Sequence, residues 1–372
     1  MRLPTVLLIL VALLPPSPAE ATAATQVRVG ILRDQDRVVV MSDRPIDVRA
    51  PGGLGTLLPA GAHEITTGAS EIRLADAGEL SGPVRFVPTA GARLFVAIRP
   101  YRGILEIRRT PSGRLTVINE LELEEYLYGV LKMEVDPRWP VEALKAQAVA
   151  ARTLAIYNLG RYQTEGYDVR ATTDTQVYGG LSAEDPRTTA AVDLTRGEVL
   201  VYQGRPILAV YHSDSGGVTE SSEYVWGGRY PYLKGVPDPH SSSAPWSVKM
   251  DLAAFEARLR RAGKSVSGIR SIVAGDLTPS GRVGSVRIVS GAGTITLRAT
   301  ELRGLLGADV MKSTLFTVRV LPDEQPAVEF AGRGSGHGVG MSQWGARGLA
   351  LLGRFYADIL RYYYAGVTIE SR

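Results

Sequence analysis

The chain has 372 residues, and its 42 Lys and Arg outnumber its 38 Asp and Glu to give a formal net charge of +4. Hydrophobic residues make up 45% of it and charged residues 22%, which excludes a globally disordered chain. The lack of cysteine excludes disulfides, thiol catalysis and a cysteine-bound zinc site. The basic residues are not clustered, so the sequence predicts no nucleic-acid partner, although its charge suits an anionic cell wall.

The first 24 residues are laid out like a secretory signal peptide. A basic start at Arg2 is followed by an apolar run over residues 6–14, three prolines and several alanines. The run is shorter than the roughly 20 residues of a membrane-spanning helix, and no later segment is apolar enough to be one. We expect cleavage between about Ala19 and Ala24 and a secreted or cell-envelope protein without a membrane span. The alternative is that the run is a buried element of the fold.

The next part of the chain is rich in predicted strands. Segments such as QVRVGIL and RVVVMS alternate or are β-branched, and Gly, Pro and Asp turns separate them. Residues 103–121 predict a β-hairpin with a Pro-Ser-Gly turn. From Leu121 the pattern becomes helical, is broken at residues 136–140, and continues as the strongest helix of the chain over residues 141–162. The fold class that we predict is therefore α+β.

The second half of the chain has weaker patterns. Residues 170–235 are dense in Thr, Ser, Gly and Tyr and predict short strands and loops. Short helices are predicted at 251–263 and 299–307, with strands between them. Near the end, a glycine-rich loop leads into a helix within residues 341–366.

Glu134 is the first candidate for chemistry. It ends a helical segment and is flanked by Val130, Met133 and Val135, whose burial would raise a carboxyl pKa toward the range of a general acid. From chemistry alone a surface glutamate is the better interpretation, and other carboxylates compete for a catalytic role: Glu124, Glu125 and Asp136.

Two polar loops are further candidates. Between residues 332 and 340 every second residue is glycine, with His337 in the middle, which predicts a backbone that approaches a ligand or a tight packed turn. It matches neither a dinucleotide-binding nor a phosphate-binding loop. The DSGG of residues 214–217 and the AGAH of residues 60–63 echo serine-protease loops, but a polar loop lining a cleft is the better interpretation. Aromatic residues in polar loops suit sugar recognition as well as a core: Tyr178, Trp226, Tyr230, Tyr232, Trp246 and Trp344.

Taken together, these segments resemble the sporulation stage II protein D (SpoIID) and LytB amidase-enhancer family. The residues that carry the resemblance are YRGILEI, LTVINELELEEYLYGVLKMEV, EALKAQAVAARTLAIY, TDTQVYGG, YHSDSGGVTESSEYVWGG and GSGHGVGMSQWGARGLALLG. They cover roughly residues 95–372. With the signal peptide at 1–24, the resemblance implies a strand-rich region at 25–98 and a SpoIID-like domain at 99–372, in which the long helix lies beside a groove.

The resemblance implies a lytic transglycosylase, a carbon–oxygen lyase that cleaves peptidoglycan between N-acetylmuramic acid and N-acetylglucosamine and prefers glycan stripped of stem peptides. Glu134 would be the catalytic acid and base, and the C6 hydroxyl of the sugar the internal nucleophile, so that no second carboxylate is needed. The resemblance also implies groove residues that bind substrate: Lys145, Gln147, Arg152, His212, Ser215, His337 and Gln343. Helical spacing puts Lys145 and Arg152 on one face and Gln147 well off it.

The sequence departs from the family pattern at two places, and other functions are compatible with it. The chain has Glu134-Val135-Asp136-Pro137 where the family commonly has Glu-Met-Pro, and it lacks the cysteines that hold a zinc ion in some members. We therefore predict no metal and no cofactor. The alternatives are a peptidoglycan-binding protein that stimulates a cell-wall amidase without Glu134, a structural envelope protein, and hydrolysis in place of transglycosylation.

Overall fold

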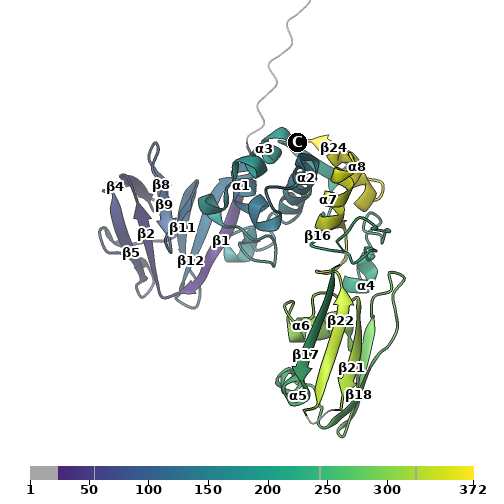
Figure 1. Ribbon diagram of the computed structural model, residues 1–372. Coiled ribbons are helices and arrows are strands. Elements are labelled where there is room, and N and C mark those ends of the chain that lie inside the picture. The colour runs from purple at the N-terminus through teal and green to yellow at the C-terminus, as the bar shows by residue number, and fades with distance from the viewer. Residues whose placement is uncertain (1–23, 54, 243, 323–324) are drawn as a thin grey trace, which may run out of the picture.

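The computed structural model describes residues 24–372 except 54, 243 and 323–324. The expected signal peptide lies outside the described residues apart from its last position, Ala24. Figure 1 shows a strand-rich part, a central helical part and a third part that hangs below the helices. The mixture of helices and strands confirms the predicted α+β class. Within the described ranges, no helix is long and apolar enough to cross a membrane.

Two sheets form the strand-rich part and share one core, which includes Val29, Val40, Ile65 and Phe86. The first has the order β13 (Val169–Arg170), β1 (Gln26–Gln35), β12 (Leu115–Glu122), β11 (Ile104–Arg109), β8 (Val84–Pro88), β3 (Ile46–Arg49), β4 (Thr56–Leu58). The second has the order β10 (Arg99–Tyr101), β9 (Leu94–Val96), β2 (Arg37–Ser42), β5 (Gly61–Thr67), β6 (Ile72–Leu74), β7 (Gly78–Leu80).

Strand pairing continues across the boundary expected at residue 98. Strands β9 and β10, on either side of it, are antiparallel neighbours. The predicted hairpin is confirmed as β11 and β12, which pair from Ile104 opposite Glu120 to Arg109 opposite Leu115. Strand β13 pairs in parallel with β1 and leads directly into the polar segment after residue 170.

The two strongest predicted helices are confirmed as α1 (Leu123–Glu134) and α2 (Val141–Tyr157). Helix α2 is rich in alanine and packs on two sides: Ala148 and Ala151 belong to the core of the strand-rich part, whereas Ala146 and Val149 belong to a second core. Helix α2 therefore joins the two cores.

The prediction of only short strands and loops over residues 170–235 was wrong at two helices, α3 (Pro186–Leu194) and α4 (Ser222–Trp226). Threonine and proline lower the helical signal of α3, but the Asp185 side chain caps it and proline is tolerated in a first turn. The remaining short elements here are η1 (Gln163–Glu165), η2 (Gly180–Ala183), β14 (Glu198–Tyr202), β15 (Arg205–Pro206) and β16 (Tyr211–His212).

The C-terminal residues complete the second core. They form β23 (Met341–Ser342), α7 (Gln343–Leu351), α8 (Tyr356–Tyr363) and β24 (Thr368–Ser371). The predicted helical segment is thus two helices, because the chain turns at residues 352–355, where Gly353 has a φ of 81°. Strand β24 pairs with β14 and returns the chain to the central part.

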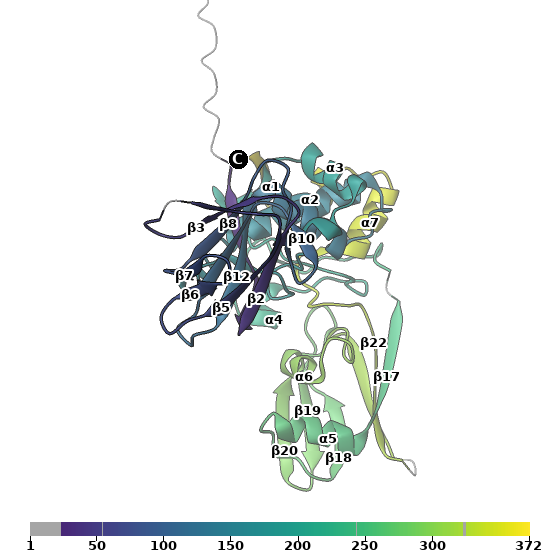
Figure 2. The ribbon, with the colours of Figure 1, turned by 90° about the vertical axis from the view of Figure 1, so that its left-hand side faces the viewer.

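Residues 245–333 form an inserted domain with its own core around Phe255, Ile288 and Phe330. Its first and last strands pair, with Pro245 opposite Arg333. The chain therefore enters and leaves this domain at neighbouring positions. Figures 1 and 2 both show it extending away from the rest of the protein. Its elements are β17 (Pro245–Asp251), α5 (Leu252–Arg261), β18 (Ile269–Ala274), β19 (Ser285–Ser290), β20 (Gly293–Arg298), α6 (Ala299–Leu306), β21 (Phe316–Leu321) and β22 (Ala327–Arg333).

Candidate active site

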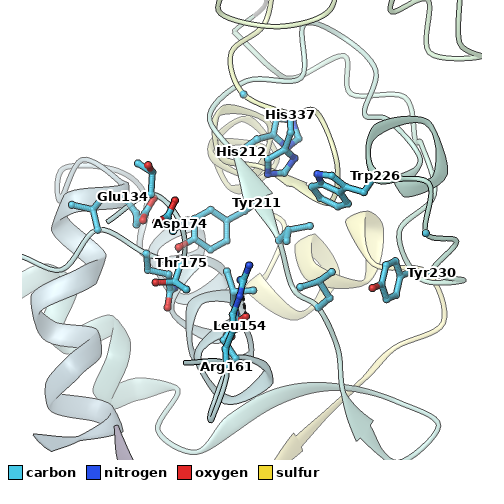
Figure 3. A pocket seen from close by; sticks show the side chains of 18 residues that line it. Glu134, Leu154, Arg161, Asp174, Thr175, Tyr211, His212, Trp226, Tyr230 and His337 are labelled. Carbon is cyan, nitrogen blue, oxygen red and sulfur yellow. Dashed lines mark hydrogen bonds between the residues drawn. The ribbon is translucent and has the colours of Figure 1, made fainter. Parts of the chain in front are cut away.

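A cavity of about 700 Å³ lies between the end of α1, the end of α2 and the loops around β16 and α4. Figure 3 shows Glu134 and Asp174 toward one end of the view, Trp226 and Tyr230 toward the other, and Tyr211 between them. The cavity also contains both histidines of the predicted polar loops. Its lining includes Glu134, Leu154, Asn158, Arg161, Asp174, Thr175, Gln176, Tyr211, His212, Trp226, Tyr230 and His337.

The two polar loops meet because β16 and β23 pair in parallel, with His212 opposite Ser342. Asp214 and Ser335 exchange two backbone hydrogen bonds of 3.0 and 2.8 Å. Glycine is needed here: Gly336 has a φ of 107°, and a Cβ there would lie 2.7 Å from the Cβ of His212. The glycine-rich loop is therefore both a tight packed turn and a wall of the cavity.

The Glu134 carboxyl group is half-buried at the wall of the cavity. Burial raises its pKa above the usual value, while hydrogen bonds from the Val177 backbone N–H and the side chains of Tyr211 and Gln343 oppose this rise. The desolvation expected for Glu134 is present, although Met133 beside it is exposed. A raised pKa keeps a larger share of the acid protonated near neutral pH, as a general acid requires.

A chain of buried side chains orients the groups that contact Glu134. The Tyr126 hydroxyl donates to Gln176 Oε1 at 3.2 Å, and Gln176 Nε2 donates to the Tyr211 hydroxyl at 3.0 Å. Because the Tyr211 oxygen accepts this bond, its own proton is directed to Glu134. Gln343 is held in turn by Gln147, with Nε2 donating to Oε1 at 3.5 Å.

His212 and His337 are both neutral at neutral pH. Burial lowers the pKa of His337 to about 4, with a further contribution from the charge of Arg303, and burial also lowers the pKa of His212 well below its usual value. His212 Nδ1 donates to the Val339 carbonyl at 3.1 Å, and its buried Nε2 has no partner among the described residues. His337 lies against Trp226, with ring centroids 5.2 Å apart. His212 and His337 therefore present hydrogen-bonding groups and aromatic rings to the cavity, and no positive charge.

The buried neutral state of His337 predicts a loss of stability in acid. Its pKa is about 4 folded and about 6.5 unfolded, so the unfolded chain binds more protons between these values and stability falls as the pH falls. We expect His337 to account for about 3 kcal/mol of the free energy of unfolding lost between pH 7 and pH 4. Urea unfolding across this range should show a smaller loss for His337→Gln than for the parent. Parallel curves for the two proteins would refute the expectation.

Three of the residues predicted to bind substrate lie elsewhere. Arg152 is fully buried, and its Nε and Nη2 donate to Glu124 at 2.8 and 2.7 Å. The Ser215 hydroxyl is also buried and donates to Asp238 at 2.6 Å. Lys145 pairs with Glu142 at 3.0 Å and does not line the cavity. The expectation that these three face the groove is corrected, because their polar atoms already have partners within the fold.

Of the remaining predicted residues, three line the cavity, whereas Gln147 and Gln343 are buried and do not line it. Glu134, His212 and His337 line it, Gln343 bonds to Glu134, and Gln147 supports Gln343. The similarity of residues 60–63 and 214–217 to serine-protease loops does not correspond to a catalytic triad. His63 lies in β5 and pairs with Asp76 at 2.7 Å.

Sequence reasoning assigned no role to four residues of the site: Arg161, Asp174, Gln176 and Tyr211. Asp174 and Gln176 lie in the segment TDTQVYGG, whose resemblance to the family was the available signal. Tyr211 begins the segment YHSDSGGVTESSEYVWGG, which carries the same resemblance, whereas nothing in the local pattern distinguishes Arg161 from a surface residue.

The fold and cavity define an α+β protein with one half-buried glutamate facing a space lined by aromatic and neutral polar groups. The profile of the stage II sporulation protein family matches residues 111–202, and a domain of unknown function (DUF8618) matches residues 233–340. Stage II sporulation protein D of Bacillus subtilis is 34% identical over 272 residues, which cover 68% of this chain and 76% of that protein. The chain therefore belongs to the SpoIID family, as its sequence predicted.

Two other relatives are of similar closeness. An uncharacterised protein of Brachyspira hyodysenteriae is 38% identical over 261 residues, 69% of each chain. A protein of Bacillus subtilis named amidase enhancer is 32% identical over 293 residues, which cover 66% of this chain but only 40% of the relative. Together these relationships support a role related to the cell wall.

Proposed function

We propose that this protein is exported to the cell envelope and cleaves peptidoglycan glycan strands by lytic transglycosylation, with Glu134 as acid and then base. The observation that carries the proposal is the half-buried Glu134 carboxyl group, whose pKa is raised at the wall of a large cavity. Support for the envelope comes from the family relationship and from the pattern of residues 1–24.

The proposed reaction needs only one carboxyl group. Protonated Glu134 gives its proton to the glycosidic oxygen, and the bond from that oxygen to C1 of the muramic sugar breaks. The resulting carboxylate then takes the proton of the C6 hydroxyl of the same sugar, whose oxygen bonds to C1 and closes a 1,6-anhydro ring. His212 and Trp226 supply an unpartnered hydrogen-bond acceptor and a flat ring of the kind that bind neutral sugars.

Asp174 is the residue that an ordinary hydrolase would use as its second carboxylate. It is half exposed, and its Oδ2 lies 3.3 Å from Arg170 Nη1, so a cation already engages it. We therefore favour the internal nucleophile over a water molecule activated by Asp174.

Product analysis tests the proposal. The protein is incubated with intact peptidoglycan and with glycan stripped of stem peptides by an amidase, and the new ends are identified by mass spectrometry. We expect 1,6-anhydromuramic ends from the stripped glycan, with Asp174→Asn retaining them. Reducing muramic ends that disappear in Asp174→Asn would indicate hydrolysis, and no new ends from either substrate would overturn the enzymatic proposal.

A second candidate function, stimulation of a cell-wall amidase, is favoured by an exposed apolar patch at the turn between α7 and α8. Leu351, Leu352 and Phe355 are 61%, 63% and 68% exposed. Apolar side chains exposed together suit a protein partner, and one relative is named amidase enhancer. In this case amidase activity should rise on addition of the Glu134→Gln variant and not on addition of Phe355→Ser. Equal stimulation by both variants would argue against this patch.

The interaction between Tyr211 and Glu134 predicts how the cleavage rate depends on pH. The Tyr211 hydroxyl stabilises the charged form of Glu134, so Tyr211→Phe should raise the pKa of that carboxyl group further. Protonated Glu134 then persists to higher pH, and the alkaline limb of the rate profile should move to higher pH. The matched control is Tyr178→Phe, a buried tyrosine that bonds to Asn119. A downward shift, or equal shifts in both variants, would contradict the assignment.

A further inference from the structure

We propose that Trp139, Trp344 and Arg347 form a second sugar subsite outside the cavity, and that Arg347 recognises the free lactyl carboxylate of a muramic residue without its peptide. The subsite rests on the proposed function, because it extends the same glycan beyond Glu134. None of the three side chains lines the cavity, and of the three only Trp139 packs against the core of the strand-rich part.

The three side chains form one aromatic and cationic cluster. The rings of Trp139 and Trp344 lie 5.2 Å apart at 56°, and the Arg347 guanidinium lies 5.2 Å from the Trp344 ring and 6.0 Å from the Trp139 ring. Trp344 and Arg347 are three residues apart on α7 and so share a face. Trp344 is 37% exposed, which leaves part of its ring for a ligand.

The cluster adjoins the catalytic carboxyl group without lining the cavity. Gln343, the residue before Trp344, donates its side-chain hydrogen bond to Glu134. Trp139 lies in the short turn that follows Glu134 at the end of α1. A polymer cleaved at Glu134 must extend past it on both sides. In this proposal the cavity with Trp226 holds one side of the glycan, and the Trp139–Trp344–Arg347 cluster holds the other.

Arg347 has no hydrogen bond or ion pair with any described residue, and its buried Nε is unpartnered. By contrast, the neighbouring Arg138 is neutralised by Asp136 at 2.6 Å. A guanidinium held by two rings and free of a counter-ion fits a carboxylate with two parallel hydrogen bonds. Removal of the stem peptide breaks the lactyl amide and exposes such a carboxylate on muramic acid, whereas N-acetylglucosamine has none.

Calorimetric binding in the Glu134→Gln protein tests the subsite. The probes are a peptide-free tetrasaccharide with alternating muramic residues and chitotetraose, which has the same length and no carboxylate. We expect the muramic probe to bind about tenfold more tightly, and Arg347→Gln to remove this preference while chitotetraose binds as before. Arg347→Lys should restore part of the preference, Trp344→Ala should weaken both probes, and the surface variant Arg319→Gln should change neither.

Equal affinity for both probes in the Glu134→Gln protein, or a preference that survives Arg347→Gln, would overturn the subsite. Trp344→Phe, which keeps a ring, serves if Trp344→Ala fails to fold. These outcomes are independent of cleavage. A muramic preference that depends on Arg347 but without cleavage products would overturn the enzymatic function and leave the subsite standing.

Discussion

Replacement of Glu134 by glutamine should lower the rate of glycan cleavage by about 10²–10⁴-fold, the usual contribution of general acid–base catalysis. Glutamine keeps the shape of the side chain and an oxygen that accepts hydrogen bonds from the Val177 backbone and Tyr211. It has no proton to give to a glycosidic oxygen. Binding of a peptide-free glycan should therefore stay within a few-fold of the parent, because only the protonation chemistry is lost.

The matched control is Glu125→Gln on the same helix. Glu125 lies 3.9 Å from Arg102 and does not line the cavity, so cleavage should be unaffected. Rates would be measured from the appearance of new glycan ends, and thermal unfolding would show that both variants fold. Cleavage by Glu134→Gln at the parental rate would remove the residue from the mechanism. A loss of glycan binding in this variant would indicate a structural role instead.

Replacement of Arg152 by methionine should lower the free energy of unfolding by about 3–5 kcal/mol, because it leaves the buried Glu124 carboxylate without its partner. Arg152 also donates to the Val192 and Glu198 carbonyls at 3.1 Å, so several acceptors lose their donor at once. Cleavage per folded molecule should remain, since the Arg152 side chain does not line the cavity.

Urea unfolding of three variants separates the effect of an unpaired buried charge on stability from the effect of losing an ion pair. Arg152→Met with Glu124→Leu removes both charges and should recover part of the lost stability. Arg319→Met breaks a surface pair with Glu329 and should leave the free energy of unfolding almost unchanged. A stable Arg152→Met protein that no longer cleaves glycan would reinstate the role in substrate binding that the sequence suggested.

The elements with strong local signals could be predicted, and those that depend on distant contacts could not. Carboxylates in the first turn and a Pro-rich stop defined α1, and the Pro-Ser-Gly turn defined the β11–β12 hairpin. The family resemblance assigned Arg152 to the groove, and helical spacing could not correct this, because spacing tells which residues share a face and not which face meets a cleft. Helix α2 is buried on nearly every side, so a polar residue on it can contact the core of the protein just as well as the cavity.

The candidate site was predicted in part for a similar reason. Glu134 and the two histidines stood out by chemistry and by resemblance to the family. The role of Tyr211 depends on the pairing of β16 with β23, which are about 130 positions apart, and on Gln176 from a third segment. No local pattern contains that information. The inserted domain was missed because its strands and helices are individually ordinary, and only the pairing of Pro245 with Arg333 makes them a unit.

That pairing has a consequence for how the protein assembles. The chain between His212 and Met341 contains 128 residues, of which the 89 residues 245–333 have their two ends tied together. Once this domain has folded, bringing β16 and β23 together closes a loop of only about 40 residues. The entropic cost is then lower than for the full 128 residues by about 1 kcal/mol. Residues 245–333 contribute no side chain to the cavity. Their folding nevertheless lowers the entropic cost of bringing the loop after β16 to the glycine-rich loop.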